Sequence, residues 1–508
     1  TANLENFMND HRQKVIEIIT KNNKVNLNPS EKELLALVEN YRIKNKDNLI
    51  MFKTNITSRS KSFTKYVNDV NYEKYDYTVS NIIDALQKEE LIVVTIKIGM
   101  NENIQLKGTT ILSKEFASKA LMLKRNFYFS DHDIAESDMI SIDLPHFEER
   151  LVMVDYRENQ RMTYITGIDY YGEHKMSHLR MAMEMMRKQK NALGLHAGSK
   201  IYDLENNTKI GMIIFGLSGT GKTTLTTHDH NHRSPISKVG ILQDDIVFMD
   251  ENANIFGSEN GMYVKCADVP GHKQITKAVL SIKNKAIIEN VHVTEKGEID
   301  WFNFNHTKNS RAMIMRESLE NTTKNIDLPQ LDIILFNTRR PELPPIIRLM
   351  NSNQIAAYYA LGESIITSAE TKDKELIGSS KRVVGFDPFI INHPEINIMK
   401  LKKIVDKNKH VKAYVVNTGY VKNPKNDIPV NITLKCIEGV LSNKIEWQYD
   451  ERMKVDIPKK IDGFVWEDYD PKLLYEKEYE DVLDKLRNER IDHLEKIGIV
   501  DNEIINSI

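Results

Sequence analysis

Residues 211–231, GMIIFGLSGTGKTTLTTHDHN, constrain the fold more tightly than any other segment of this chain. They begin with an apolar run typical of a buried strand, continue into a glycine-rich bend and end in residues that can start a helix. The bend fits the pattern G-x-x-x-x-G-K-[ST] at Gly216, Gly221, Lys222 and Thr223. Such a turn aims several backbone N–H groups at one point, where the phosphates of a nucleotide can bind. The segment therefore predicts a nucleotide-binding loop between a strand and a helix.

Each residue type in this loop has a chemical task. The Lys222 ammonium would reach the β- and γ-phosphates of ATP, and the Thr223 hydroxyl would bind Mg²⁺. An ordinary glycine turn is the alternative, but the apolar strand ahead of the bend and the Thr-Leu stretch behind it favour phosphate binding. The other members of the predicted nucleotide-binding set are Gly216, Leu217, Ser218, Gly219, Thr220, Gly221 and Thr224.

A pair of carboxylates follows the loop in the sequence. Asp244 and Asp245 interrupt a second apolar run, GILQDDIVFMD, where a strand would end. A carboxylate in this position, beside a phosphate loop, holds the metal ion that is bound to the phosphates. A solvated pair of acids is the alternative, and the nearby phosphate loop favours the metal site. Residues 228–232, HDHNH, resemble a metal-binding tract, but their place just after the predicted helix favours a polar surface loop.

Length and composition restrict the class of protein. At 508 residues the chain predicts two or three domains, and 41% hydrophobic with 28% charged residues is typical of a soluble globular protein. A net charge of −2 gives no general attraction to nucleic acid or to an anionic membrane, so we expect neither as a partner. Cys266 and Cys436 are too few for a disulfide framework or a cysteine zinc site. A polar start and the lack of an 18-residue apolar window predict a cytoplasmic protein.

Strand-like apolar runs alternate with helical patterns along the chain, which favours an α/β fold. Helices are expected within residues 1–48, with a start near Ser30, and at 176–194 and 471–498, and residues 115–129 are expected to form a helix followed by a strand. Strands are expected at 90–100, within 150–175, and at 211–217, 238–250, 261–269, 287–294, 299–304, 330–338 and 410–420.

The sequence GLSGTGKTTL is similar to the phosphate loop of ATP-dependent phosphoenolpyruvate carboxykinases, in a form that is specific to that family. Other segments resemble motifs of the family in the same order, and a fainter similarity lies at TSRS (57–60). The resemblance runs from about residue 54 to about residue 440 and is strongest from 167 to 311. The matching segments are DYYGEHKM (169–176), LHAGS (195–199), IIENV (287–291), TKNSR (307–311), LPPIIRL (343–349) and YVVNTGY (414–420).

The resemblance implies both an architecture and an activity. It implies a two-domain α/β fold, with a substrate-binding domain at residues 1–193 and a P-loop nucleotide-binding domain with a helical tail at residues 194–508. The family converts oxaloacetate and ATP to phosphoenolpyruvate, ADP and CO₂, a step of gluconeogenesis. It uses Mg²⁺ with the nucleotide and a second metal, often Mn²⁺. We therefore expect small-molecule substrates, and either a monomer or a homo-oligomer.

Matching positions imply the roles of single residues on the substrate side. Arg59 and Arg311 would bind the carboxylate and phosphoryl groups, a task that suits the bidentate guanidinium. Tyr170 would line the substrate pocket. Lys175 would neutralise charge near the transferred phosphoryl group.

The resemblance also implies a metal set and a further nucleotide contact. His196 and Asp245 would bind the second metal ion. Glu289 would contact the nucleotide.

The sequence departs from the family pattern at several of these places. Met176 replaces a lysine that binds the second metal in the family, and a thioether is a poor ligand for Mn²⁺. Ile246 and Val247 replace a Glu-His pair, and Ser58 replaces the glycine ahead of Arg59. Three hypotheses therefore stay open. They are a carboxykinase with altered metal binding, a related ATP-dependent kinase of another small acid or hydroxyl acceptor, and a nucleotide-binding regulatory protein without turnover.

Overall fold

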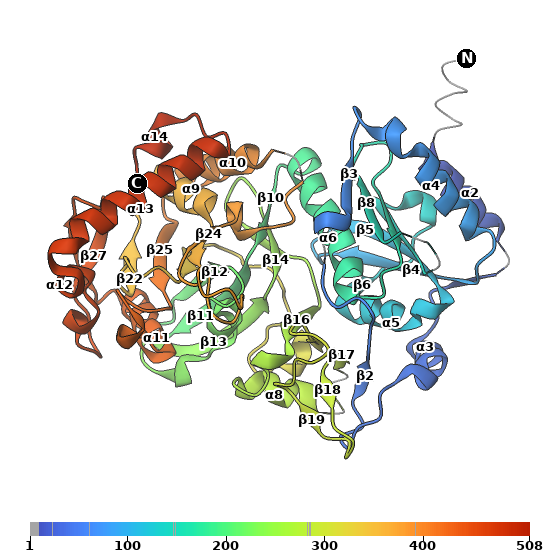
Figure 1. The fold of residues 1–508 in the computed structure, drawn as a ribbon, viewed down its shortest axis with the longest axis horizontal. Helices are drawn as coiled ribbons and strands as arrows, with labels where there is room; N and C mark the ends of the chain where they lie inside the picture. Colours follow the sequence, from blue (N-terminus) through green and yellow to red (C-terminus); the bar gives the residue numbers. More distant parts are fainter. Residues whose placement is uncertain are drawn as a thin grey trace. The chain divides into compact units, whose positions relative to one another are not determined.

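The structure is a computed structural model that describes residues 10–22, 24–59, 61–145, 147, 149–281, 283, 286–391 and 393–508. It divides into two compact units. Unit 1 comprises the described residues of Thr1–Met185 and Ser258–Glu320, and unit 2 those of Met186–Gly257 and Asn321–Ile508. Both units combine sheets with helices (Figure 1), which confirms the predicted two-domain α/β class.

The division differs from the single boundary near residue 193 that the sequence suggested, because residues 258–320 fold with the first unit. Strand pairing explains this. β2 (Ile50–Phe52) pairs in parallel with β17 (Ile287–Glu289), which lies beside β20 (Arg311–Met315) and then β16 (Gly261–Lys265). Hydrogen bonds between segments so far apart leave no mark on the local sequence pattern.

A mixed sheet with the strand order β1-β4-β5-β7-β9-β8-β3 forms the centre of unit 1, and β6 is added beside β4. Helices α2 and α4 pack on one face of this sheet, where they contact strand side chains such as Ile111 of β5. On the other face Thr110 is hydrogen-bonded to His178 of α6. The alternating side chains of a strand thus meet helices on both faces, which explains the almost continuous apolar run of β4.

The remaining bounds in unit 1 are as follows. The strands are β1 (Val25–Leu27), β3 (Thr64–Val67), β4 (Leu91–Ile98), β5 (Leu106–Ser113), β6 (Tyr128–Phe129), β7 (Met139–Leu144), β8 (Leu151–Asp155), β9 (Met162–Thr166), β18 (His292–Val293) and β19 (Ile299–Asp300). The helices are α2 (His11–Lys21), α3 (Glu31–Val38), α4 (Asp76–Leu86), α5 (Ala117–Asn126), α6 (Tyr171–Gln189) and α8 (Lys273–Leu280). The Ser30 hydroxyl accepts a hydrogen bond from the Glu33 N–H at the start of α3, which confirms the predicted helix start.

Unit 2 contains a larger mixed sheet with the order β13-β11-β12-β21-β25-β22-β27-β26, and a smaller sheet β10-β14-β15. β12, β21 and β25 run parallel at its centre, so their carboxyl ends meet at one edge. The strands are β10 (Leu193–His196), β11 (Gly198–Leu204), β12 (Lys209–Phe215), β13 (Ile236–Gln243), β14 (Ile246–Met249), β15 (Ile255–Gly257), β21 (Ile333–Thr338), β22 (Ile346–Arg348), β23 (Glu363–Ile365), β24 (Ser380–Arg382), β25 (Lys412–Asn417), β26 (Glu446–Asp450) and β27 (Val455–Lys460). The helices are α7 (Lys222–Thr227), α9 (Ser352–Leu361), α10 (Pro394–Lys407), α11 (Val430–Leu441), α12 (Pro471–Tyr475), α13 (Tyr479–Lys496) and α14 (Asn502–Ile505).

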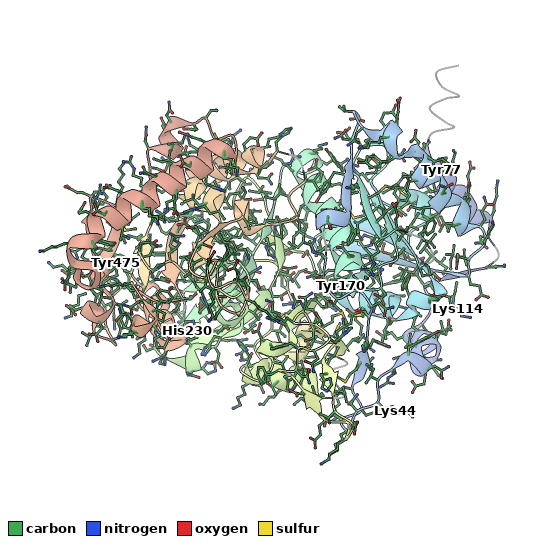
Figure 2. The ribbon with its side chains drawn as sticks, in the orientation of Figure 1. Lys44, Tyr77, Lys114, Tyr170, His230 and Tyr475 are labelled. Atoms are coloured by element: carbon green, nitrogen blue, oxygen red, sulfur yellow. The ribbon has the colours of Figure 1, made fainter. Side chains whose placement is uncertain are left out.

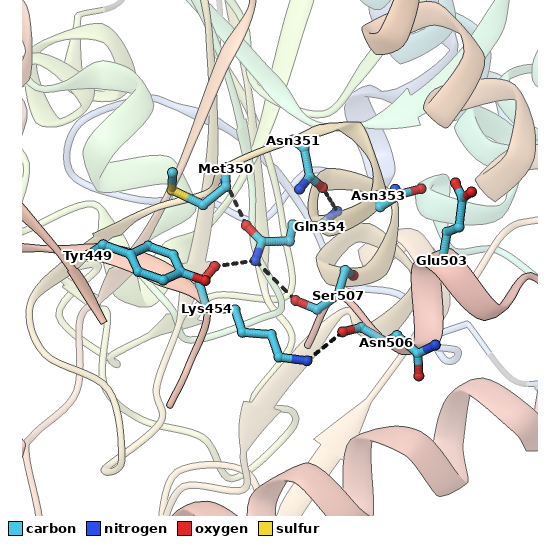
Figure 3. Close-up of a pocket in the computed structure, with 9 residues that line it drawn as sticks. All are labelled: Met350, Asn351, Asn353, Gln354, Tyr449, Lys454, Glu503, Asn506 and Ser507. Atoms are coloured by element: carbon cyan, nitrogen blue, oxygen red, sulfur yellow. Dashed lines mark hydrogen bonds between the residues drawn. The ribbon is translucent and has the colours of Figure 1, made fainter. Parts of the chain in front are cut away.

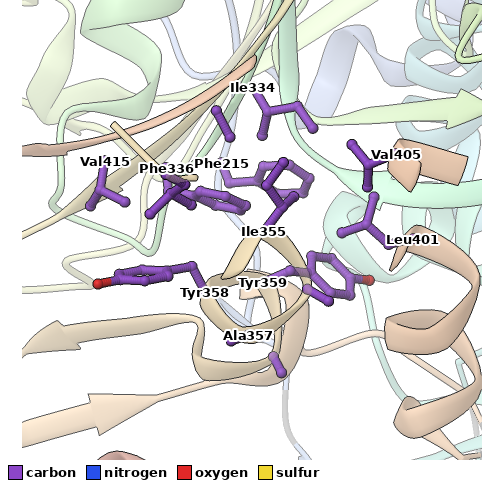
Figure 4. Packing of buried hydrophobic residues seen from close by; sticks show 14 of the residues in the cluster. Phe215, Ile334, Phe336, Ile355, Ala357, Tyr358, Tyr359, Leu401, Val405 and Val415 are labelled. Carbon is purple, nitrogen blue, oxygen red and sulfur yellow. The ribbon is translucent and has the colours of Figure 1, made fainter. Parts of the chain in front are cut away.

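An aromatic cluster supports the carboxyl ends of the central strands of unit 2. Phe215 of β12 and Phe336 of β21 stack with ring centroids 5.3 Å apart, and Phe386 lies 5.7 Å from both. Helices α9 and α10 cover this cluster, as Figure 4 shows for several of its members. Because Phe215 immediately precedes Gly216, the cluster fixes the point from which the glycine-rich loop departs.

Two expected elements are interrupted in the structure. The run at 238–250 divides into β13 and β14, because Asp244 and Asp245 leave the strand. The expected helix at 471–498 divides into α12 and α13, because Glu476 adopts a left-handed φ of 54°. No helix among the described residues is long and apolar enough to span a membrane.

Candidate active site

The glycine-rich loop of unit 2 has the predicted local structure. Strand β12 ends at Phe215, and α7 begins at Lys222. Gly219 and Gly221 adopt φ values of +84° and +87°, in the left-handed region that favours glycine. The Thr220 hydroxyl donates to the carbonyl of Leu217 at 2.7 Å, which closes the turn from within.

Neighbouring strands hold this loop from the side. The Thr418 hydroxyl, after β25, donates to the Thr220 carbonyl at 2.6 Å. A Cβ on Gly216 would lie only 2.5 Å from the Thr220 hydroxyl oxygen and 3.2 Å from the Asn337 Cβ, so this position requires glycine. The segments 211–231 and 414–420, recognised separately in the sequence, therefore meet at one loop.

Three of the predicted site residues gather beside the loop. The Asp245 carboxylate lies 2.9 Å from the His196 Nε2 and 3.8 Å from the Lys222 Nζ. All three side chains are partly exposed, at 18%, 17% and 12% respectively. Asp244, the other acid of the pair, is buried at 8% exposure, and Thr223 is half-buried at the start of α7.

The contacts of His196 fit a metal ligand. Its Nδ1 donates to the Phe386 carbonyl at 2.5 Å, which orients the ring and leaves Nε2 facing Asp245. Two ligand atoms each about 2.1 Å from an octahedral cation and at right angles lie about 3 Å apart, close to the observed separation of Nε2 and the Asp245 oxygen. Among the described residues no group of three or more His, Cys, Asp or Glu side chains could hold an ion.

The HDHNH segment differs from the expected polar surface loop, because its central histidine is fully buried. The His230 Nε2 lies 2.9 Å from the Tyr202 hydroxyl, and its Nδ1 lies 2.9 Å from the Glu438 carboxylate (Figure 2 labels His230). Arg233 binds the same carboxylate. Burial lowers the pKa of His230 to about 4. His230 is therefore a buried polar anchor, whereas Asn231 and His232 of the same segment are exposed, as expected of a surface loop.

The substrate-side residues of unit 1 gather around Tyr263 of β16. The Lys175 Nζ lies 5.5 Å and the Arg311 Cζ 6.0 Å from the centroid of the Tyr263 ring. The Tyr170 ring centroid lies 6.3 Å away; Tyr170 immediately precedes α6 (Figure 2). Arg59 is half-buried, and burial together with the nearby charge of Arg180 lowers its pKa.

Tyr263 and Glu259 are residues of this site that the sequence did not reveal. Tyr263 lies in the segment 261–269, which was interpreted only as a strand, and Glu259 lies just ahead of that segment. Strand pairing brings both residues to this site. Lys175 is buried and lies 3.5 Å from the buried carboxylate of Glu259. Asn126 also donates to Glu259, at 3.0 Å.

Glu289 differs from the expected nucleotide contact. Its side chain has 0% exposure, and its carboxylate is paired with the buried ammonium of Lys119. It also accepts hydrogen bonds from the Tyr263 hydroxyl at 3.0 Å and the Tyr171 N–H at 3.4 Å. A carboxylate enclosed in this way orients Tyr263 and is not presented to a ligand in this conformation.

Comparisons with known proteins show the family of the chain. The family model of phosphoenolpyruvate carboxykinase matches residues 6–466. The chain belongs to the phosphoenolpyruvate carboxykinase family. It is 35% identical over 439 residues to the phosphoenolpyruvate carboxykinase (ATP) of Aeropyrum pernix, which covers 86% of each chain.

More distant relatives carry the same name. The chain is 27% identical over 424 residues to the phosphoenolpyruvate carboxykinase (ATP) of Brevibacillus brevis, covering 77% of this chain and 74% of the relative. It is 25% identical over 472 residues to that of Staphylococcus haemolyticus, covering 86% and 83%. Family membership confirms the resemblance drawn from the motifs. It also confirms the expectation of an enzyme of phosphoenolpyruvate carboxykinase type that works with ATP and divalent cations.

Behind the phosphate loop, Lys200 of β11 supports the carboxyl end of α7. Its buried ammonium donates to the carbonyls of Leu225 at 2.7 Å and His228 at 2.9 Å. Burial lowers the pKa of Lys200 to about 7, and the neutral amine would still offer two N–H groups to these two carbonyls. Because α7 begins at Lys222, a residue that fixes its far end also fixes the position of the loop lysine.

We expect Lys200→Met to weaken the binding of ATP. The variant leaves two buried carbonyls without their donor, at about 1–3 kcal/mol each, and loosens α7. The KM for ATP should rise several-fold and the midpoint of thermal unfolding should fall. Lys238→Met, on an exposed position of β13, is the control. Equal KM values for ATP in both variants and the wild type would contradict this role of Lys200.

A separate pocket of about 530 Å³ lies in unit 2 at the start of α9 (Figure 3). Among the described residues, those that line it include none of the predicted site residues. Its polar groups bind one another: Gln354 accepts from the Met350 N–H and donates to the carbonyls of Lys454 and Ser507. The pocket therefore presents no group arranged for the family's chemistry.

Proposed function

We propose that the chain converts oxaloacetate and ATP to phosphoenolpyruvate, ADP and CO₂. The observation that carries this proposal is the 35% identity to an ATP-dependent phosphoenolpyruvate carboxykinase across 86% of each chain. Lys175 and Arg311 beside Tyr263 in unit 1 and the glycine-rich loop of unit 2 support it, because the reaction needs binding sites for a dicarboxylate and for a triphosphate.

On the nucleotide side, the N–H groups of residues 216–224 bind the phosphates of ATP. Lys222 supplies a positive charge at the β- and γ-phosphates, and the Thr223 hydroxyl and Asp244 hold Mg²⁺. His196 and Asp245 are the residues that would hold a second cation. Divalent cations supply charge that stabilises the developing negative oxygen atoms.

On the substrate side, Arg59 and Arg311 bind the carboxylate and phosphoryl groups by paired N–H donors. Cleavage of the C–C bond of oxaloacetate releases CO₂ and leaves the electron pair on an enolate. The enolate oxygen then attacks the γ-phosphorus in line, and the bond from phosphorus to the oxygen of ADP breaks. Lys175 offsets negative charge at the enolate oxygen. Tyr170 lines the pocket in which the substrate is oriented.

Three of the departures from the family pattern, Met176, Ile246 and Val247, are core residues, whereas Ser58 is exposed. Met176 is buried in α6 at 4% exposure. Ile246 is fully buried in β14, where it pairs with His196 of β10. We propose that the chain uses fewer protein ligands for its second cation than the family pattern prescribes. Nothing in the comparisons supports a different acceptor or a protein without turnover.

An assay with ATP, Mg²⁺, Mn²⁺ and oxaloacetate tests this function, with phosphoenolpyruvate and ADP measured together. We expect the two products in equal amounts, and none without ATP or without divalent cations. ADP formed without phosphoenolpyruvate would contradict the proposal, since it would show that the γ-phosphoryl group goes to another acceptor.

A further inference from the structure

The described residues 53–59, which follow β2 and carry Arg59, form no helix or strand. An irregular segment of this kind loses conformational entropy when it is held in one shape, so it needs specific contacts to position a side chain. Side chains from three other segments of unit 1, around Asp169, Asn290 and residues 306–309, bind its backbone.

Asp169 makes two of these contacts with a single carboxylate. Its Oδ2 accepts a hydrogen bond from the Asn55 N–H at 2.8 Å, and its Oδ1 accepts one from the Ile56 N–H at 2.9 Å. Both oxygens of one carboxylate are thus used by two consecutive backbone N–H groups. A carboxylate suits this arrangement because it offers two acceptors and no donor, and its charge strengthens both bonds.

The other contacts fix the segment at either side of this pair. The Thr54 N–H donates to the Asn290 Oδ1 at 2.7 Å, and the Thr54 carbonyl accepts from the His306 Nε2 at 2.9 Å. The Thr57 carbonyl accepts from the Asn309 Nδ2 at 2.6 Å. These contacts lie on residues 54–57, shortly ahead of the arginine.

The same side chains also reach the other substrate-side residues. Asp169 directly precedes Tyr170 in the chain. Asn309 lies two residues before Arg311 and donates to the Tyr170 hydroxyl at 3.3 Å. The positive charge of Arg180 lowers the pKa of Arg59 and the negative charge of Glu173 raises it, so both charges lie near the arginine.

We propose that Asp169 is a positioning residue, whose carboxylate holds residues 53–59 so that Arg59 and Tyr170 bind oxaloacetate together. The inference rests on the proposed function. It assigns Asp169 no contact with substrate: the residue acts through the backbone of Asn55 and Ile56.

Asp169→Asn tests the inference with almost no change of shape. The amide NH₂ replaces one acceptor and faces a backbone N–H, so at least one of the two bonds is lost. We expect the KM for oxaloacetate to rise about tenfold or more while the KM for ATP stays within twofold. Asp138→Asn is the matched control, because the Asp138 carboxylate also accepts a backbone N–H in unit 1, from Lys107 at 2.7 Å. It should leave both KM values unchanged.

Hydrogen exchange at the amides of Asn55 and Ile56 provides a readout that does not depend on activity. Exchange should be faster in Asp169→Asn than in the wild type and unchanged in Asp138→Asn. Unchanged exchange, or an equal rise of both KM values, would overturn the inference. A wild-type protein that forms no phosphoenolpyruvate would overturn the proposed function instead, and the exchange rates would still decide whether Asp169 holds the segment.

Discussion

Lys222→Ala is expected to reduce the formation of phosphoenolpyruvate by about 10²–10³-fold, the range found when one preorganised donor is removed from a developing negative charge. Lys222 starts α7, and its Nζ lies 3.8 Å from the Asp245 carboxylate. In the proposed reaction this ammonium stabilises the phosphates as the γ-phosphoryl group is transferred. Its removal takes away that charge and also the ammonium beside the Asp245 carboxylate.

Initial rates measured at saturating oxaloacetate over a range of ATP concentrations check this prediction. Lys209→Ala is the control, because Lys209 begins β12, the strand that leads into the loop, and its side chain is 68% exposed. The control should keep wild-type rates. Turnover retained in Lys222→Ala would refute the assignment of residues 216–224 as the ATP site, since the lysine is the charged member of that loop.

Lys175→Met is expected to lower the formation of phosphoenolpyruvate by a comparably large factor, for two separate reasons. The first is catalytic, because the proposed reaction loses the positive charge beside the enolate, at about 10²-fold or more in rate. The second is structural. Glu259 is 1% exposed, and loss of an ionic partner from a buried carboxylate destabilises a fold by about 3–5 kcal/mol.

The double variant Lys175→Met with Glu259→Gln separates the two causes. A neutral glutamine keeps the oxygen that accepts from Asn126 and removes the uncompensated charge. Thermal unfolding should therefore recover toward the wild-type midpoint, while the rate of phosphoenolpyruvate formation stays low. Recovery of both would show that Lys175 supports the fold alone, and its catalytic role would then have to be abandoned.

The sequence predicted the phosphate loop in detail because its structure depends on neighbours within a few residues. The strand β12, the left-handed glycines at 219 and 221 and the start of α7 at Lys222 all follow from the order of apolar, glycine and hydroxyl residues. The start of α3 after Ser30 follows from the same kind of local hydrogen bond. The family motifs then named the residues on the substrate side.

The amino-acid sequence by itself determined the α/β class, the local structure of the glycine-rich loop and the family. Only the tertiary structure decided which charged side chains are buried and what they touch. It placed Glu289 against Lys119 and Tyr263, Asp169 against the backbone of residues 55–56, and residues 258–320 in the first unit. The physical reason is the distance along the chain over which each interaction acts. Backbone conformation responds to adjacent residues, whereas burial and ion pairing depend on segments that meet only after the strands have paired.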